Sequence, residues 1–194
     1  MDGIGRSPAE GGWHDTSVPA FPGLAWSDGW ATGYGCAVLG DPVYTDKHDG
    51  AFFWQNIDTY TASGGELPAP APDAEDVMSS QSPGVLQRMS ELEVSRIVWG
   101  LAGDGLRPLY DALGSARMTQ PLASGFERGY QRHEYEQNAD GSGYQDIVMT
   151  RDPAPMVADF LDALNCSGFS RSRLREVIEP DRRYPYPVDA PLCR

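Results

Sequence analysis

The feature that most constrains this chain of 194 residues is the concentration of its aromatic side chains near the N-terminus. Half of the aromatic residues lie in the first 62 positions, among many Gly, Pro, Asp and Ser residues. This segment has much apolar surface to bury but little helical or strand pattern with which to build its own core. It is therefore expected to wrap another surface, either the later half of the same chain or a partner protein. The residues assigned to this contact are Trp13, Phe21, Trp26 and Trp30.

Net charge is the second constraint. The chain carries 28 Asp and Glu against 15 Lys and Arg, which gives a formal net charge of −13. Most of the excess lies in residues 1–83, where Arg6 and Lys47 face 12 acidic residues. An acidic surface repels nucleic acid and anionic membranes and favours basic partners. Charge therefore predicts one or more protein partners and argues against nucleic acid and membranes.

Composition divides the chain into four segments. Residues 1–62 form the aromatic, acidic N-terminal region. Residues 63–83 form a linker rich in Pro, Ala and Ser, for which extended polyproline geometry is expected. Residues 84–180 contain the predicted core, and residues 181–194 form a Pro-rich C-terminal arm. The predicted fold class is α+β, with a small helical core and a β-hairpin preceded by an irregular, strand-containing N-terminal region.

Within the N-terminal region, residues 1–33 are predicted to be irregular, with strand-like sequence beginning near Tyr34. Residues 43–45 and 51–54 are apolar runs that flank an Asp-Gly dipeptide. Such a dipeptide supplies the positive-φ positions that a tight turn needs. A β-hairpin is therefore expected here.

Apolar residues at helical spacing predict four helices in the core. The first is expected to start at Ser82-Pro83 and to run to about Leu101, because serine can cap a helix and proline suits its first position. The second covers residues 106–113 and ends at a glycine. The third begins at Asp152-Pro153, and the fourth runs from Ser170 to Ile178.

A second hairpin is expected over residues 130–150, where two strand-like runs flank the turn-rich sequence NADGSG. The same turn places oxygen-bearing side chains at several positions of a calcium-binding loop. However, Met149 occupies the position of the bidentate glutamate, and no helix is expected directly after it. The segment is therefore interpreted as a turn, and no metal ligand is predicted.

The order helix, helix, ambiguous segment, hairpin, helix across residues 85–165 resembles the winged-helix DNA-binding domains of the MarR and HxlR type. The resemblance is carried by LYDALG, FERGYQRHEYEQ, the turn NADGSG and IVMT. It implies that the hairpin is the wing and that the preceding segment is the recognition helix. Pro121 and Gly125 depart from the pattern because they would interrupt that helix. The cations that this alternative would place on DNA are Arg117, Arg128 and Arg132.

The three cysteines, Cys36, Cys166 and Cys193, are widely spaced and form no CxxC pair. They predict neither a disulfide framework nor a zinc site, so a reducing compartment is expected. The sequence NCSGF at 165–169 resembles the Asp-Cys-Ser-Gly-Phe signature of NlpC-type cysteine peptidases, in which a later histidine is the base. No histidine follows Cys166, so a buried, unreactive thiol is expected instead.

Neither targeting nor catalysis is indicated by the remaining motifs. The N-terminus lacks the basic and apolar regions of a signal peptide, and no apolar run is long enough to span a membrane. His14-Asp15 and His48-Asp49 are typical of solvated turns. No catalytic residue, metal ligand or cofactor is predicted, and the expected location is cytoplasmic or virion-associated.

These observations favour a non-enzymatic interaction protein, in the first place a structural or accessory subunit of a larger assembly. A virion component and a small subunit of a multi-protein complex would both fit. The alternatives are an acidic inhibitor of the immunity type and a winged-helix regulator. Carboxylates clustered on one face would favour the inhibitor, and arginines aligned beside a packed hairpin would favour the regulator.

Overall fold

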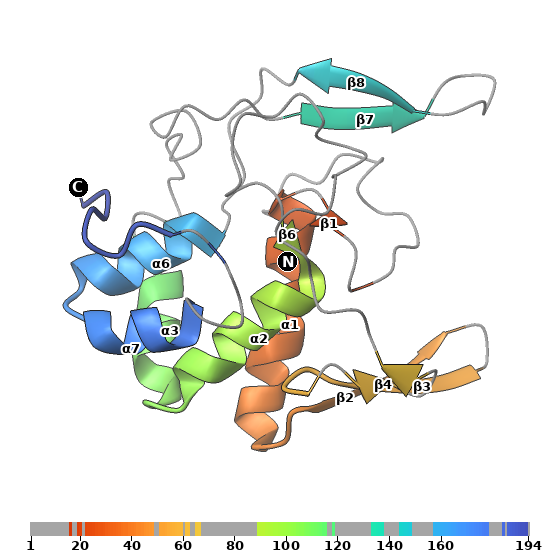
Figure 1. Ribbon diagram of the computed structural model, residues 1–194, viewed down its shortest axis with the longest axis horizontal. Coiled ribbons are helices and arrows are strands. Elements are labelled where there is room, and N and C mark those ends of the chain that lie inside the picture. The colour runs from red at the N-terminus through yellow and green to blue at the C-terminus, as the bar shows by residue number, and fades with distance from the viewer. Residues whose placement is uncertain are drawn as a thin grey trace.

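The computed structural model in Figure 1 confirms the predicted α+β class. Its described residues form five helices and three small antiparallel sheets. The helices are α1 (Pro22–Leu39), α2 (Glu91–Ala102), α3 (Leu106–Leu113), α6 (Val157–Cys166) and α7 (Arg171–Ile178). The residues that the structure describes are 16, 19–20, 22–48, 51–59, 61–62, 65–66, 89–115, 118, 133–137, 144–148, 157–178, 184 and 186–193.

The largest sheet has the strand order β2-β3-β4-β5. Its strands are β2 (Val43–His48), β3 (Ala51–Asn56), β4 (Thr61–Ala62) and β5 (Gly65–Glu66). The other sheets pair β1 (Pro19–Ala20) with β6 (Met89–Ser90) and β7 (His133–Gln137) with β8 (Tyr144–Val148). Both predicted hairpins are thereby confirmed, as β2–β3 and β7–β8. Apart from β5, the predicted linker at 63–83 lies outside the described residues.

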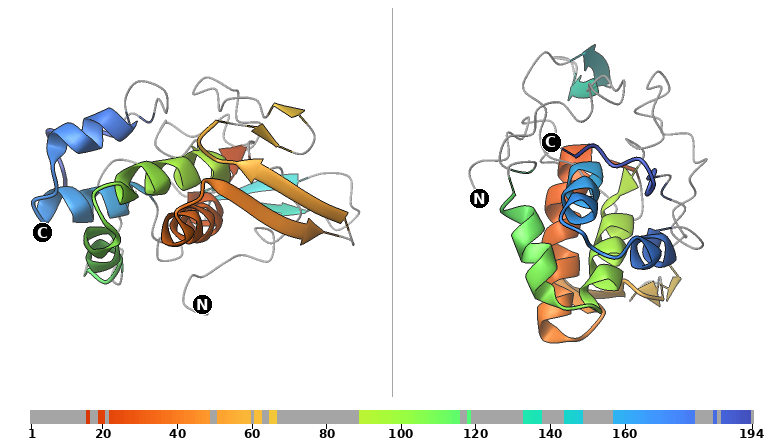
Figure 2. Two further views of the ribbon diagram at one scale, coloured as in Figure 1. Left: turned by 90° about the horizontal axis from the view of Figure 1, so that it is seen from below. Right: turned by 90° about the vertical axis from the view of Figure 1, so that its left-hand side faces the viewer.

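Helices α1 and α2 lie side by side at the centre of the molecule in every view (Figures 1 and 2). Helices α3, α6 and α7 gather on one side of this pair. The β2–β3 hairpin extends away from it on the opposite side. No helix in the described part of the chain is long and apolar enough to cross a membrane.

Helix α1 corrects the expectation that residues 1–33 are irregular and that strand-like sequence begins near Tyr34. Residues 22–39 are helical, and the first strand of the hairpin starts only at Val43. The prediction was wrong because α1 contains four glycines and no clear apolar stripe, so its sequence lacks the pattern of a helix. Its stability must therefore come from tertiary packing rather than from intrinsic propensity.

That packing is a close contact between the backbones of α1 and α2. A Cβ atom built on Gly29 would lie 2.5 Å from the Cβ of Val94 and 2.7 Å from the carbonyl oxygen of Glu91. A Cβ on Gly33 would lie 2.4 Å from the carbonyl oxygen of Ser95. Both glycines therefore let the helices approach more closely than any side chain would allow. The same residues that weaken α1 as an isolated helix make its contact with α2 possible.

The main core forms around this helix pair. Trp26 and Trp30 are 2% and 9% exposed, and each ring centroid lies 5.2 Å from that of Phe160 on α6. Of the two surfaces considered for the N-terminal aromatic residues, the later half of the same chain is therefore the one on which these two tryptophans pack. Trp13 and Phe21 lie outside the described residues.

Helix α2 begins later than predicted. It starts at Glu91 rather than at Pro83, with Ser90 as its N-cap. The Ser90 side chain accepts a 3.1 Å hydrogen bond from the amide of Glu93, which satisfies a donor that the first turn leaves unpaired. The backbone of Ser90 meanwhile pairs with Pro19 in the small β1–β6 sheet. The predicted end is confirmed, because Gly103 caps the C-terminus.

Three other predicted helices are present as α3, α6 and α7. Helix α3 covers 106–113 and ends at Gly114, as predicted. Helix α6 starts at Val157, and the residues between the predicted start at Asp152 and this point lie outside the described part. The apolar positions that identified α6 and α7 are fully or almost fully buried, at Val157, Phe160, Leu161, Leu164, Leu174, Val177 and Ile178.

Substitution of two glycines in α1 tests the contact with α2. We expect Gly33→Ala to lower the free energy of unfolding by about 1 to 3 kcal/mol, because the new methyl group would overlap the backbone of Ser95. Gly35→Ala is the matched control, since no atom lies within 4 Å of its Cβ position. This control should raise stability by about 0.5 to 1 kcal/mol. Urea unfolding measures both values, and equal effects at the two positions would contradict the close contact.

Candidate functional site

The two faces of the β2–β3 hairpin differ in exposure. The register pairs Thr45 with Trp54 and Lys47 with Phe52, so these four side chains share one face. Phe52 is 69% exposed and Trp54 is 36% exposed. Two large aromatic side chains and the single lysine of the chain therefore lie together on an outward surface. We refer to Thr45, Lys47, Phe52 and Trp54 as the aromatic face.

The opposite face of the hairpin attaches it to the helices. The rings of Tyr44 and Phe53 are in contact, with centroids 6.2 Å apart. Gln55 is buried and accepts a 2.8 Å hydrogen bond from the hydroxyl of Thr16. Tyr44 also packs against a small buried cluster that joins α1, the end of the hairpin and α2. Its members are Cys36, Ile57 and Leu92.

Two groups in this attachment are held in their neutral forms. Burial raises the pKa of Tyr44 to about 12, and the hydrogen bond that its hydroxyl donates to Asp46 acts in the same direction. Burial also raises the pKa of the Cys36 thiol, and the negative charge of Asp41 adds to that effect. Both groups therefore remain protonated near neutral pH, which gives the Cys36 thiol a structural rather than a nucleophilic character.

Carboxylates cover the outer edge of β2. Because β2 pairs with β3 in a register that puts His48 opposite Ala51, the amides of Val43 and Lys47 point away from β3. The Val43 amide donates a 2.9 Å hydrogen bond to Asp41, and the Lys47 amide donates a 2.6 Å hydrogen bond to Asp46. These bonds occupy donors to which an added strand would otherwise bind, so the edge is protected against pairing. A partner would therefore contact the aromatic face rather than extend the sheet.

Further apolar exposure lies where α1 leads into the hairpin. Val38 and Leu39, in the last turn of α1, are 58% and 79% exposed. The chain then turns at Gly40, which has a φ of +70°, and enters β2. Tyr110 is also exposed, but it belongs to α3, and this helix lies on the other side of the helix pair (Figure 1). Most of the exposed large apolar side chains in the described residues thus belong to the hairpin or to the helix end that carries it.

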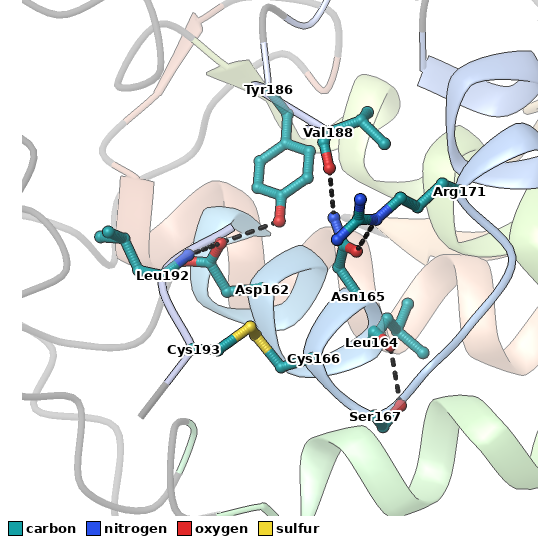
Figure 3. Close-up of a disulfide and its surroundings, with 10 residues drawn as sticks. All are labelled: Asp162, Leu164, Asn165, Cys166, Ser167, Arg171, Tyr186, Val188, Leu192 and Cys193. Carbon is teal, nitrogen blue, oxygen red and sulfur yellow. Dashed lines mark hydrogen bonds between the residues drawn. A yellow bond between two sulfur atoms is a disulfide. The ribbon is translucent and has the colours of Figure 1, made fainter. Parts of the chain in front are cut away.

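The C-terminal arm is the second feature with functional potential. Its described residues, 184 and 186–193, run over α6, as Figure 3 shows in part, and include a turn in which the Ala190 amide donates to the Pro187 carbonyl. The Tyr186 hydroxyl donates a 2.8 Å hydrogen bond to Asp162, and the Leu192 amide donates to the same carboxylate oxygen at 3.0 Å. The side-chain amide of Asn165 donates to the carbonyl of Val188 at 2.7 Å. The arm is therefore fastened to α6 along its length.

A disulfide between Cys166 and Cys193 completes this attachment (Figure 3). The expectations of no disulfide and of a buried Cys166 thiol were therefore wrong, because Cys166 is exposed at the end of α6 and bonded to the arm. The expectation failed because the two cysteines are 27 positions apart, and only the path of the arm brings them together. The cysteines therefore no longer indicate a reducing compartment.

The residues assigned to a partner or to DNA have different outcomes. Trp26 and Trp30 lie inside the chain's own core, and their role in partner binding stays a prediction. Trp13 and Phe21 lie outside the described residues, as do the arginines named for DNA binding: Arg117, Arg128 and Arg132. Residues 138–143, the predicted turn of the second hairpin, are likewise outside them. Among the described residues, no group of three His, Cys, Asp or Glu side chains is placed to hold a metal ion.

Sequence reasoning did not single out Phe52 and Trp54 as exposed. The signal was present in the alternation of β3, because every second side chain of a strand lies on the same face. The sequence alone did not indicate which of the two faces would meet the helices.

Comparison of the chain with protein-family models, with curated proteins and with solved structures finds no match.

Loss of the disulfide should destabilise the protein measurably. A cross-link over 27 residues restricts the unfolded chain, so we expect Cys193→Ser to lower the free energy of unfolding by about 3 to 4 kcal/mol. Urea unfolding gives the value. Dithiothreitol should lower wild-type stability to the same level and leave the variant unchanged. A variant as stable as the oxidised wild type would show that the bond does not constrain the chain.

Proposed function

We propose that this protein is a non-enzymatic interaction protein that acts as a structural or accessory subunit of a larger protein assembly, such as a virion or a multi-protein complex. The observation that supports the proposal is the aromatic face, on which Phe52 is 69% exposed beside Trp54. Large aromatic side chains are enriched at protein interfaces and contribute much of the binding energy there. Clustered apolar exposure on a soluble chain is also typical of a surface that a partner covers.

Charge indicates the chemistry of the partner. Asp41, Asp46 and Asp58 are exposed in the β2–β3 hairpin and at its two ends, and they outnumber Lys47 there, although Asp46 lies on the face opposite to the aromatic one. The chain as a whole carries a net charge of −13, so a second copy would be repelled. A protein surface with arginine or lysine side chains fits better. Its cations could pair with the aspartates and lie against the faces of Phe52 and Trp54.

The attachment of the hairpin supports the same role. On the inner face, Tyr44 packs on the cluster that α1 and α2 share, and Gln55 bonds to Thr16, so the aromatic face is ordered before a partner arrives. A surface that is already ordered loses less conformational entropy on binding. Acidic groups around it would speed the approach of a basic partner, and salt would slow that approach.

Capture from the native host tests the proposal. Tagged wild-type protein should retain a basic partner that mass spectrometry identifies, and Phe52→Ser should retain at least about tenfold less of it. Tyr110→Ser is the matched control, because Tyr110 is similarly exposed on α3. Both substitutions are at exposed positions, so both variants should unfold at nearly the wild-type temperature. Equal retention by the three proteins, or capture of an acidic partner, would contradict the proposed surface.

An acidic inhibitor is the second candidate. It is favoured by the exposed aspartates in the hairpin and at its ends, which would suit the basic active site or binding groove of a target. The two candidates differ in what the partner does once bound. The activity of the captured partner is then measured with and without this protein. An inhibitor would abolish that activity, whereas an assembly subunit would leave it intact.

The winged-helix alternative predicts binding to duplex DNA, whereas the proposed function predicts none. With a net charge of −13, we expect no submicromolar binding to duplex DNA at physiological salt, because duplex affinity depends mainly on phosphate neutralisation. Fluorescence anisotropy with fragmented genomic DNA of the host measures this. Tight binding with a steep salt dependence, lost in a protein carrying Arg117→Ala and Arg132→Ala, would instead favour the regulator.

A further inference from the structure

We infer that residues 189–193 of the C-terminal arm form a redox-controlled strap, which the Cys166–Cys193 disulfide holds on α6 and which reduction releases without unfolding the core. This inference is independent of the proposed function, because the strap and the aromatic face are on different elements. Figure 3 shows the strap, the disulfide and the α6 residues beneath them.

The arm has an inner and an outer part that differ in burial. In the inner part, Tyr184, Tyr186 and Val188 are each 4% exposed and belong to the main hydrophobic core. In the outer part, which is the strap, residues 189, 190 and 193 are exposed and residues 191 and 192 are half-buried. Removal of the inner part would open the core, but removal of the strap would not.

The surface beneath the strap is polar. Asp162, Asn165 and Cys166 lie three and one positions apart on α6, so they share one face of the helix. Asp162 accepts a hydrogen bond from the Leu192 amide, and Cys166 forms the disulfide with Cys193. Water can hydrogen-bond to Asp162 once the strap leaves, and Pro191 and Leu192 are only half-buried, so release of the strap exposes little apolar surface. Opening of the strap can therefore remain local.

The covalent bond is the strongest attachment of the strap. Without it, the strap keeps the Leu192 hydrogen bond to Asp162 and an ion pair between Arg175 and the exposed Asp189. A hydrogen bond to a carboxylate stabilises by about 1.5 to 3 kcal/mol, and an exposed ion pair by at most about 1 kcal/mol. These contacts are too weak to keep five residues ordered, given a loss of roughly 1 kcal/mol or more of backbone entropy per residue.

The bond is also open to a reductant, because Cys166 and Cys193 are both exposed. A dithiol attacks one sulfur as its thiolate and forms a mixed disulfide, while the other protein sulfur leaves and takes up a proton. The second thiol of the reductant then displaces the first protein sulfur. Two electrons pass to the protein, which gains two thiols, and the dithiol becomes a cyclic disulfide. Cys36 is buried and takes no part.

Backbone amide order parameters from nuclear magnetic resonance relaxation test the strap in the full chain. In the oxidised protein, Leu192 and Tyr186 should both have values near 0.85, as in rigid backbone. In the presence of dithiothreitol, the value for Leu192 should fall below about 0.6, and the value for Tyr186 should stay near 0.85. This measurement reports motion in the folded state, so a lower global stability does not affect it.

Cys193→Ser provides the matched variant. It should show the low value at Leu192 without dithiothreitol, and the reagent should not change it further. A Leu192 value that stays near 0.85 in the reduced protein would show that hydrogen bonds alone hold the strap. A fall at Tyr186 and along α6 as well would show that the disulfide supports the core. Either result overturns the inference, and reduced wild type decides the question even if the variant does not fold.

Discussion

The backbones of α1 and α2 meet at Gly29 and Gly33, where an added Cβ atom would lie only 2.4 to 2.7 Å from backbone atoms of α2. On one side of this contact, Trp26 and Trp30 extend into the core and meet Phe160 of α6. On the other side, Cys36 of α1 and Leu92 of α2 pack with Ile57 at the end of the hairpin. Both the main core and the attachment of the hairpin therefore depend on the same approach of two helices.

The contact also determines which aromatic residues are available to a partner. Helix α1 carries Trp26 and Trp30 into the interior, and the hairpin that follows presents Phe52 and Trp54 outward. Aromatic residues that are close in sequence thus divide between the core and the surface. We interpret the N-terminal region as a segment that does both: it completes the fold of the later half and presents a surface for another protein.

Much of the fold could be predicted from sequence where the pattern is local. Apolar spacing identified α3, α6 and α7, and turn residues identified the β2–β3 and β7–β8 hairpins, because the information lies within a few neighbouring positions. Helix α1 could not be predicted in this way, since its glycines lower helix propensity and only their contact with α2 explains them. The disulfide was missed for a similar reason. The proximity of Cys166 and Cys193 depends on the path of the arm, which Asp162 and Asn165 direct through hydrogen bonds over more than 20 residues.

The candidate site was only partly accessible from sequence. The acidic balance pointed to a basic partner, and the aromatic content of the N-terminal region pointed to a contact surface. The sequence could not tell which aromatic residues the core would take, because burial favours Trp26 and Phe52 equally as isolated side chains. The close packing of α1 on α2 buries Trp26 in the core. The attachment of Tyr44 to the buried cluster turns the opposite face of the hairpin, with Phe52, outward.

Fluorine resonances of protein labelled with 5-fluorotryptophan test the central claim most directly, since the chain contains five tryptophans that single substitutions can assign. The labelled protein would be titrated with the partner captured from the native host. The account predicts that the Trp54 resonance shifts or broadens on binding, while those of Trp26 and Trp30 stay unchanged within the core. An unchanged Trp54 resonance together with altered Trp26 and Trp30 resonances would contradict it, because the partner would then bind the aromatic residues that we place inside the protein.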